Sequence, residues 1–163
     1  MSESIGPNSF LSSSYARILF RHLRLTEPSG GAFFEGTDVT YRQLMELDGH
    51  LAFDVQSRLF ENALRISDRP DLGLSVGTQL HLSVHGPVGI AAFSSPNLGC
   101  ALDIFVKYSD VRAQFVEIRS DRDSGVYRLQ MVESLDLGRL RCFLTESVMS
   151  AVYSAIQFFV GAT

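Results

Sequence analysis

The segment from residue 140 to residue 160 carries an aliphatic side chain at every fourth position, and this pattern constrains the fold more than any other in the chain. The series is Leu140, Leu144, Val148, Val152, Ile156 and Val160. Because residues four apart lie on one face of an α-helix, the spacing predicts a long apolar helix. Aromatic residues widen its stripe, so we expect this helix to be buried or to self-associate. Arg141 and Glu146 interrupt the stretch and would be costly in hydrocarbon, so no membrane span is expected.

Further helices are predicted by apolar residues at three-and-four spacing. They cover residues 13–25, 50–67, 72–76 and 97–110, and a short helix starts at Thr40, where Thr40-x-x-Gln43 has the form of a capping box. Asp71 is a candidate N-cap for the helix over 72–76.

The remaining patterned segments predict short strands. Residues 80–85 alternate well enough for a strand, whereas the small apolar residues 86–93 favour a buried helix, with a strand as the alternative. Residues 114–120 and 125–134 predict an antiparallel hairpin around the Asp- and Gly-containing segment 121–125. The expected fold class is α/β in the α+β sense: a mainly helical domain with a small antiparallel sheet.

Length and composition bound the organisation of the chain. A chain of 163 residues fits a single core, and 12 Phe with no Trp indicates an aromatic-rich interior. We expect a flexible leader over residues 1–12 and one domain over 13–163. Cys100 and Cys142 stand in apolar stretches, which favours reduced core thiols and a cytoplasmic location.

The charge balance argues against nucleic-acid binding by this chain. The net charge is −4, the wrong sign for a surface that must neutralise phosphates. Arg17, Arg21 and Arg24 form a basic helix face, which is more often a solvated surface than a docking site.

The motifs of common enzymes are not found. The sequence has no phosphate-binding loop, no His-Glu-x-x-His helix and no Gly-x-Ser-x-Gly elbow. His81 and His85 lie four apart but lack further ligands nearby, so no metal and no cofactor are expected. Gly73 and Gly77 are interpreted as positions of close packing or of a turn. Catalysis is the least favoured of the functions considered.

Four residues are candidates for contact with a small ligand. Phe93 and Phe105 supply apolar walls, while His85 and Tyr108 supply polar anchors, the combination that is typical of ligand sites. The alternative is that these aromatic residues simply belong to the core.

One stretch resembles a known family. It comprises Asp71-Leu-Gly-Leu-Ser-Val-Gly77, then Gly86-Pro-Val-Gly-Ile-Ala-Ala-Phe-Ser-Ser-Pro-Asn-Leu-Gly-Cys-Ala-Leu102 and Phe105-Val-Lys-Tyr108. This pattern resembles the N-terminal effector domain of AraC-type transcription regulators, in the arabinose-binding-like subgroup. The likeness extends more weakly over residues 14–160.

The resemblance implies a domain that binds a small-molecule effector, forms a homodimer and controls a C-terminal helix-turn-helix DNA-binding unit. That unit is missing from this chain, which is therefore expected to be a fragment of a longer regulator. The alternative is a free-standing small-molecule sensor or carrier without a DNA partner.

Overall fold

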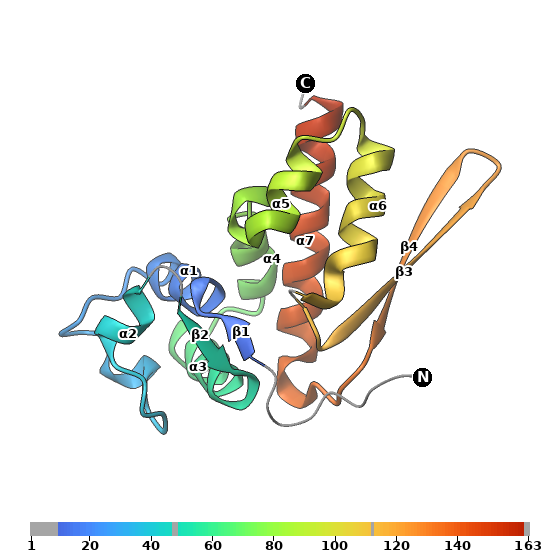
Figure 1. Ribbon diagram of the computed structural model, residues 1–163. Coiled ribbons are helices and arrows are strands. Elements are labelled where there is room, and N and C mark those ends of the chain that lie inside the picture. Colours follow the sequence, from blue (N-terminus) through green and yellow to red (C-terminus); the bar gives the residue numbers. More distant parts are fainter. Residues whose placement is uncertain (1–9, 47–48, 112, 162–163) are drawn as a thin grey trace.

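The computed structural model describes residues 10–46, 49–111 and 113–161, which form two groups of elements. The N-terminal group lies at the lower left of Figure 1. It contains β1 (Phe10–Ser12), α1 (Ser14–His22), η1 (Gly31–Phe33), α2 (Tyr41–Met45), β2 (His50–Ala52) and α3 (Phe53–Ser67).

The second group surrounds a long helix, α7, and carries a projecting hairpin (Figure 1). It contains α4 (Leu72–Gly77), η2 (Leu82–His85), α5 (Gly86–Phe93), α6 (Leu98–Tyr108), η3 (Ser109–Val111), β3 (Val116–Asp123), β4 (Val126–Glu133), η4 (Gly138–Leu140) and α7 (Arg141–Val160). The predicted fold class, mainly helical with small antiparallel sheets, is confirmed.

A short antiparallel pair of strands joins the start of the described chain to the residues just before α3. β1 pairs with β2 in the register Phe10↔Ala52, Leu11↔Leu51 and Ser12↔His50. The helix predicted over residues 50–67 therefore begins at Phe53, because residues 50–52 are taken up by this pairing. The leader expected over 1–12 overlaps β1, and its residues 1–9 lie outside the described residues.

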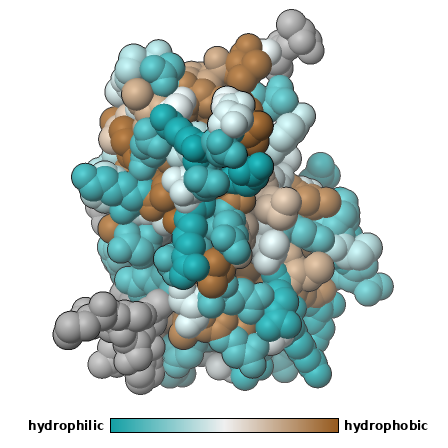
Figure 2. All heavy atoms as spheres, turned by 90° about the vertical axis from the view of Figure 1, so that its right-hand side faces the viewer, coloured by the Kyte–Doolittle hydropathy of each residue, from teal (hydrophilic) through white to brown (hydrophobic). Residues whose placement is uncertain are grey.

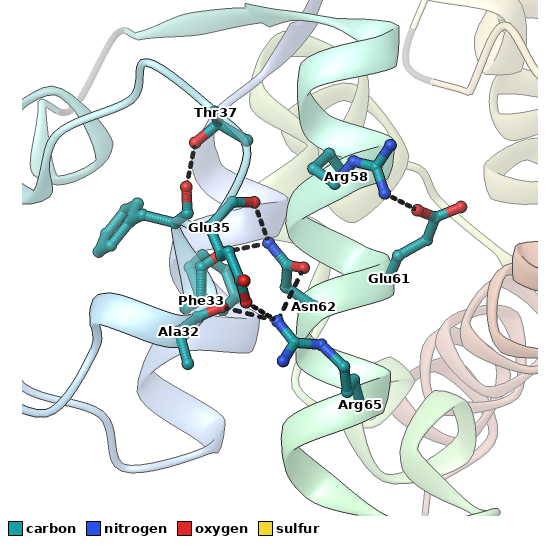
Figure 3. A network of polar contacts seen from close by, with 9 residues as sticks. Ala32, Phe33, Glu35, Thr37, Arg58, Glu61, Asn62 and Arg65 are labelled. Atoms are coloured by element: carbon teal, nitrogen blue, oxygen red, sulfur yellow. Dashed lines mark hydrogen bonds and ion pairs between the residues drawn. The ribbon is translucent and has the colours of Figure 1, made fainter.

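A buried amide fixes the loop of η1 against α3 (Figure 3). Asn62 is 5% exposed, and its Nδ2 donates to the carbonyl oxygens of Phe33 at 3.0 Å and Glu35 at 2.7 Å. Arg65 donates to Asn62 Oδ1 at 3.3 Å and pairs with the Glu35 carboxylate. Phe33 ends η1 and Glu35 lies in the turn that follows, so neither carbonyl continues into a longer helix or strand, and the Asn62 side chain supplies their donors.

The basic face predicted for α1 is only partly solvated. Arg21 and Arg24 are exposed, but Arg17 is 8% exposed and donates to the carbonyl oxygens of Leu44 and Glu46. The expectation of a solvated face is thus wrong for Arg17. Its guanidinium is buried because it supplies donors to the end of α2.

Helices α4 and α7 pack backbone to backbone. A Cβ on Gly73 would stand 2.5 Å from the Phe143 carbonyl oxygen, and one on Gly77 would stand 2.5 Å from that of Ser147. Ser147 Oγ donates to Gly73 O at 3.2 Å. The interpretation of both glycines as close-packing positions is confirmed.

Helix α7 combines a core face with an exposed apolar face. By length and composition alone, the 23 residues Gly138–Val160 could cross a membrane. In the fold, however, Phe143 and Leu144 lie in the core and the helix runs beside α4 and α6 (Figure 1). Its other side leaves Met149, Tyr153 and Val160 at least half exposed, and Phe158, near the end of the helix and on a different face, is 55% exposed.

The strand predicted over residues 80–85 is wrong. Val84 N donates to His81 O at 2.9 Å, which closes the short 3-10 helix η2. Gly86 follows with φ +61° and ψ −141°, a backbone conformation that favours glycine, and α5 begins there. This turn directs the chain straight into the next helix, so the segment meets no neighbouring strand. The preferred prediction of a helix over 86–93 is confirmed, although Ile90 and Phe93 are exposed rather than buried.

The predicted hairpin is present, with a tighter turn than expected. β3 and β4 pair from Val116↔Glu133 to Asp123↔Val126, leaving Ser124 and Gly125 as a two-residue turn. Both have positive φ, 50° and 83°, as the hairpin turn that matches strand twist requires.

Two smaller predictions need correction. Asp71 does stand at the N-cap position of α4, but its side chain makes no capping hydrogen bond; its carboxylate accepts from Arg69 Nε at 3.1 Å and Nη2 at 2.7 Å instead. Cys100 and Cys142 are both exposed. The residue that follows each cysteine in the sequence is buried, but it lies on a different face of the helix from the cysteine.

Candidate functional site

A cavity of about 90 Å³ lies where the N-terminal group meets the helices around α7. Its lining comes from α1, α3, α4, η2, α5, α6, η3, β3, α7 and adjoining segments. Most of the wall is aromatic or aliphatic, with Phe60, Phe105, Phe115, Phe143, Val88 and Val148 among the lining residues. Because segments far apart in sequence share this one space, its contents would touch both groups of elements.

A tyrosine and a histidine form a polar pair in the lining. The Tyr15 hydroxyl lies 3.1 Å from His85 Nδ1, and His85 Nε2 lies 3.3 Å from the Leu80 carbonyl oxygen. Since a carbonyl only accepts, we assign the imidazole proton to Nε2, and Tyr15 then donates to Nδ1. The pair connects α1 to η2 across the cavity wall.

Two serines in the lining direct their hydroxyls to main-chain carbonyls. Ser109 Oγ donates to Val106 O at 3.1 Å. Ser147 Oγ donates within its own helix to Phe143 O at 2.7 Å, besides its bond to α4. These hydroxyls therefore have acceptors within the protein.

Gln56 is the buried exception among the polar lining residues, since Tyr108 is 41% exposed. It lies on α3 and is 1% exposed, and neither its Nε2 nor its Oε1 has a hydrogen-bond partner. Buried polar groups are nearly always satisfied, and an unsatisfied one costs about 1–3 kcal/mol. Gln56 thus keeps a buried amide without partners beside a mainly apolar cavity.

The structure brings three of the four predicted ligand-contacting residues to this cavity. His85, Phe105 and Tyr108 belong to its lining. Phe93 does not belong to the lining; it is 55% exposed and stacks on Phe158 with ring centroids 4.8 Å apart. A ligand role for any of the four stays a prediction.

Sequence reasoning missed Tyr15 and Gln56. Gln56 precedes Phe60 by four residues and Ala63 by seven, which places a polar residue on the buried face of a helix. A glutamine at a core position of an amphipathic helix was the available signal. Tyr15 gave none, because its partner His85 lies 70 positions away.

The electrostatic setting of the cavity is neutral. None of the residues that line it is Asp, Glu, Lys or Arg. Displaced pKa values occur instead in exposed pairs outside the lining, where Arg69 lowers the pKa of Asp71 and Arg119 lowers that of Glu117. Within the described ranges, no three His, Cys, Asp or Glu side chains gather as a metal site would require.

Comparison with known proteins assigns the family. The family model for the arabinose-binding domain of AraC transcription regulators, at their N-terminus, matches residues 29–163. The chain belongs to this family. The matched region contains most of the cavity lining, including Gln56, His85 and α7, while Leu11 and Tyr15 lie before it.

A curated relative agrees with this assignment. The chain is 34% identical over 148 residues to the ornithine utilization regulator of Pseudomonas aeruginosa. The aligned part is 91% of this chain but 44% of that regulator, so the chain spans less than half the length of the relative. The resemblance to AraC-type regulators predicted from the sequence is confirmed.

Proposed function

We propose that this domain senses a small-molecule effector in the cavity between its two groups of elements and passes the signal to an attached helix-turn-helix unit that binds DNA. The observation that carries the proposal is the cavity itself. A ligand that contacts α1, α3 and α7 together would favour one arrangement of these helices over another, which is the differential affinity that regulation needs. The role is recognition rather than catalysis.

The test of effector binding uses thermal unfolding with a panel of metabolites that includes ornithine and arabinose. An effector at 100 times its dissociation constant adds about 2.7 kcal/mol to stability. Val148→Phe and Val88→Phe place bulk in the cavity from two different helices and are expected to abolish the shift. Val126→Phe is the matched control, because Val126 is 51% exposed at the tip of the hairpin and does not line the cavity.

Two results separate binding from a folding defect. Val148→Phe and Val88→Phe are first shown to unfold cooperatively. Loss of the ligand-induced increase in unfolding temperature then reports on the cavity. If every metabolite fails with the unaltered chain, or if an active one still binds both filled variants, the proposed site is wrong.

The domain also forms a homodimer in this proposal. Support comes from an exposed apolar face of α7, with Met149 60%, Tyr153 60% and Val160 70% exposed. A second exposed cluster contains Ile90 61%, Phe93 55% and Phe158 55%, in which Phe93 stacks on Phe158. In Figure 2, hydrophobic atoms gather near the end of the molecule where α7 finishes, while the hairpin side is mainly hydrophilic. Exposed apolar patches of this kind mark interaction surfaces.

Sedimentation equilibrium tests the dimer. The chain of 18.0 kDa is expected to sediment at twice that mass, and Tyr153→Ser together with Met149→Ser to return it to the monomer. Val126→Ser is the control, since Val126 is 51% exposed at the tip of the hairpin. A monomer at high concentration, with and without effector, removes dimerisation from the proposal.

DNA binding is assigned to the attached unit, not to this chain, whose net charge is −4. The location that fits this role is the cytoplasm. The coding sequence beyond Thr163 separates the regulator from the free-standing carrier: a helix-turn-helix pattern supports the regulator, and a stop codon supports the carrier.

A further inference from the structure

We infer that the attached DNA-binding unit docks on an exposed apolar cluster formed by Ile90, Phe93 and Phe158, at the end of the domain where α7 finishes. This inference rests on the proposed function, because it names the surface through which the domain controls that unit. Three observations carry it: the stacked rings of the cluster, the lack of charged residues in the segments around it and its position beside the end of α7.

The cluster joins two helices through stacked rings. Ile90 and Phe93 lie three residues apart on α5, and Phe93 stacks on Phe158 of α7 with ring centroids 4.8 Å apart. Ile90 is 61% exposed, and both rings are 55% exposed. The stack thus leaves more than half of each ring in solvent, so covering the cluster with a partner would bury apolar surface and be favourable.

Charged residues are missing from the segments that build this end of the domain. The sequence has no Asp, Glu, Lys or Arg over residues 86–102 or 147–160, although these types make up 20% of the chain. The first range covers α5 and the start of α6, and the second covers the greater part of α7. The connection from α5 to α6 passes beside the end of α7 (Figure 1). Exposed aromatic rings without charged neighbours are typical of the core of a protein interface.

A second copy of the domain fits the cluster less well than the attached unit does. The exposed face of α7 that supports the dimer contains Met149, Tyr153 and Val160. Phe158 follows Met149 by nine residues, which is about two and a half helical turns, so the two side chains point to opposite sides of α7. A copy seated on the Met149 face therefore leaves the cluster uncovered.

The attached unit, in contrast, is tethered at the cluster. Phe158 lies two residues before Val160, the last residue of α7. The family model describes a domain at the N-terminus of its regulators, and 44% of the ornithine utilization regulator is aligned, so the rest of such a regulator continues from this end of the domain. Tethering gives the unit a high effective concentration at the cluster, so even a weak apolar contact would be populated.

Helix α5 connects the cluster to the cavity. Val88 lines the cavity, and Ile90 and Phe93 follow it on the same helix. The buried residues of α5 are Gly89 and Ala92, so small residues rather than large side chains hold it against its neighbours. An effector beside Val88 would act on the helix that also contacts the attached unit, which gives the signal a direct physical route.

Hydrogen–deuterium exchange of the α5 amides tests the docking. It is measured in the 163-residue chain and in the full-length regulator. Docking is expected to slow exchange of these amides at least about tenfold in the full-length protein. The measurement uses α5 because the end of α7 would be protected simply by continuation of the chain. Equal exchange of α5 in the two proteins overturns the inference.

Variants then locate the contact. Phe158→Ser removes the ring on α7 and leaves the sequence of α5 unchanged, and Ile90→Ser removes an exposed side chain of the cluster. Either is expected to reduce the difference between full-length protein and chain, each carrying the same substitution, to less than about twofold. Val126→Ser is the matched control, because Val126 is 51% exposed at the tip of the hairpin, and it should keep the full difference. If both cluster variants also keep it, the unit docks elsewhere and the inference is overturned.

Other occupants of the cluster give different results. Protection of α5 that disappears on dilution of the full-length protein assigns the cluster to a second copy. Protection that appears only with phosphatidylglycerol vesicles assigns it to a lipid surface. Either result overturns the inference.

Failure of this inference is distinct from failure of the proposed function. If the coding sequence beyond Thr163 contains no helix-turn-helix unit, the proposed function falls and the inference falls with it. If the unit is present but leaves α5 unprotected, the sensing function stands and only the docking inference falls.

Discussion

The Tyr15 hydroxyl donates a hydrogen bond to His85 Nδ1 across 3.1 Å, joining α1 to the segment that leads into α5. The two rings also lie against one another, with centroids 5.9 Å apart. Because both residues line the cavity, this contact couples the N-terminal group to the helices around α7 at the point where an effector would sit.

Removal of this hydroxyl is expected to destabilise the domain. Tyr15→Phe leaves Nδ1 of His85 without that donor while keeping the ring, so we expect a loss of about 1 kcal/mol in the free energy of unfolding. Urea denaturation followed by circular dichroism measures it. Tyr153→Phe, at a position that is 60% exposed, should change stability by less than half as much. Equal effects of the two variants would show that the Tyr15–His85 bond contributes nothing.

The glycines of α4 set the approach of α7. In Gly73→Ala or Gly77→Ala the new methyl group would lie 2.5 Å from a carbonyl oxygen of α7, so the helices must separate. Overpacking of this kind costs about 1–3 kcal/mol. Gly31→Ala is the control, because nothing lies within 4 Å of a Cβ there. Thermal unfolding should therefore show a marked loss for the α4 variants and little change for Gly31→Ala.

Asn62 is expected to contribute more to stability than the exposed ion pair near it. Asn62→Leu removes the donor to the Phe33 and Glu35 carbonyls, and we expect a loss of about 1–3 kcal/mol. Arg58→Ala breaks the exposed pair with Glu61, which is typical of contacts worth about 0–1 kcal/mol. Urea denaturation compares the two. A larger loss in Arg58→Ala would contradict the assignment of Asn62 as the anchor of this loop.

The elements that the sequence predicts well are those with long internal periodicity. The helices over 97–110 and 140–160 and the paired segments of the hairpin are found within a few residues of the prediction. Each contains enough repeats for one face to be buried, so local pattern and tertiary packing agree. The segment 80–85 is too short for such agreement, and its conformation follows from the turn at Gly86.

The candidate site is predicted less completely, for a physical reason. His85, Phe105 and Tyr108 belong to one stretch of sequence and were found together, whereas Gln56 and Tyr15 reach the cavity only through the packing of α1 and α3 on the later helices. An unsatisfied amide cannot be recognised in a sequence, because satisfaction depends on neighbours from other elements.

The cysteines provide the last prediction, since their sequence neighbours suggested burial and the fold exposes both. Cys100 lies three residues before Asp103 and seven before Lys107, which are also exposed, so it belongs to the solvent face of α6. Cys142 follows the exposed Arg141. Both thiols are therefore expected to react with Ellman's reagent in the native protein, giving two equivalents per chain without denaturant. Cys100→Ser should leave one equivalent and change stability by no more than about 0.5 kcal/mol, as is usual at exposed sites. Reaction that begins only after urea is added would show instead that the thiols are buried.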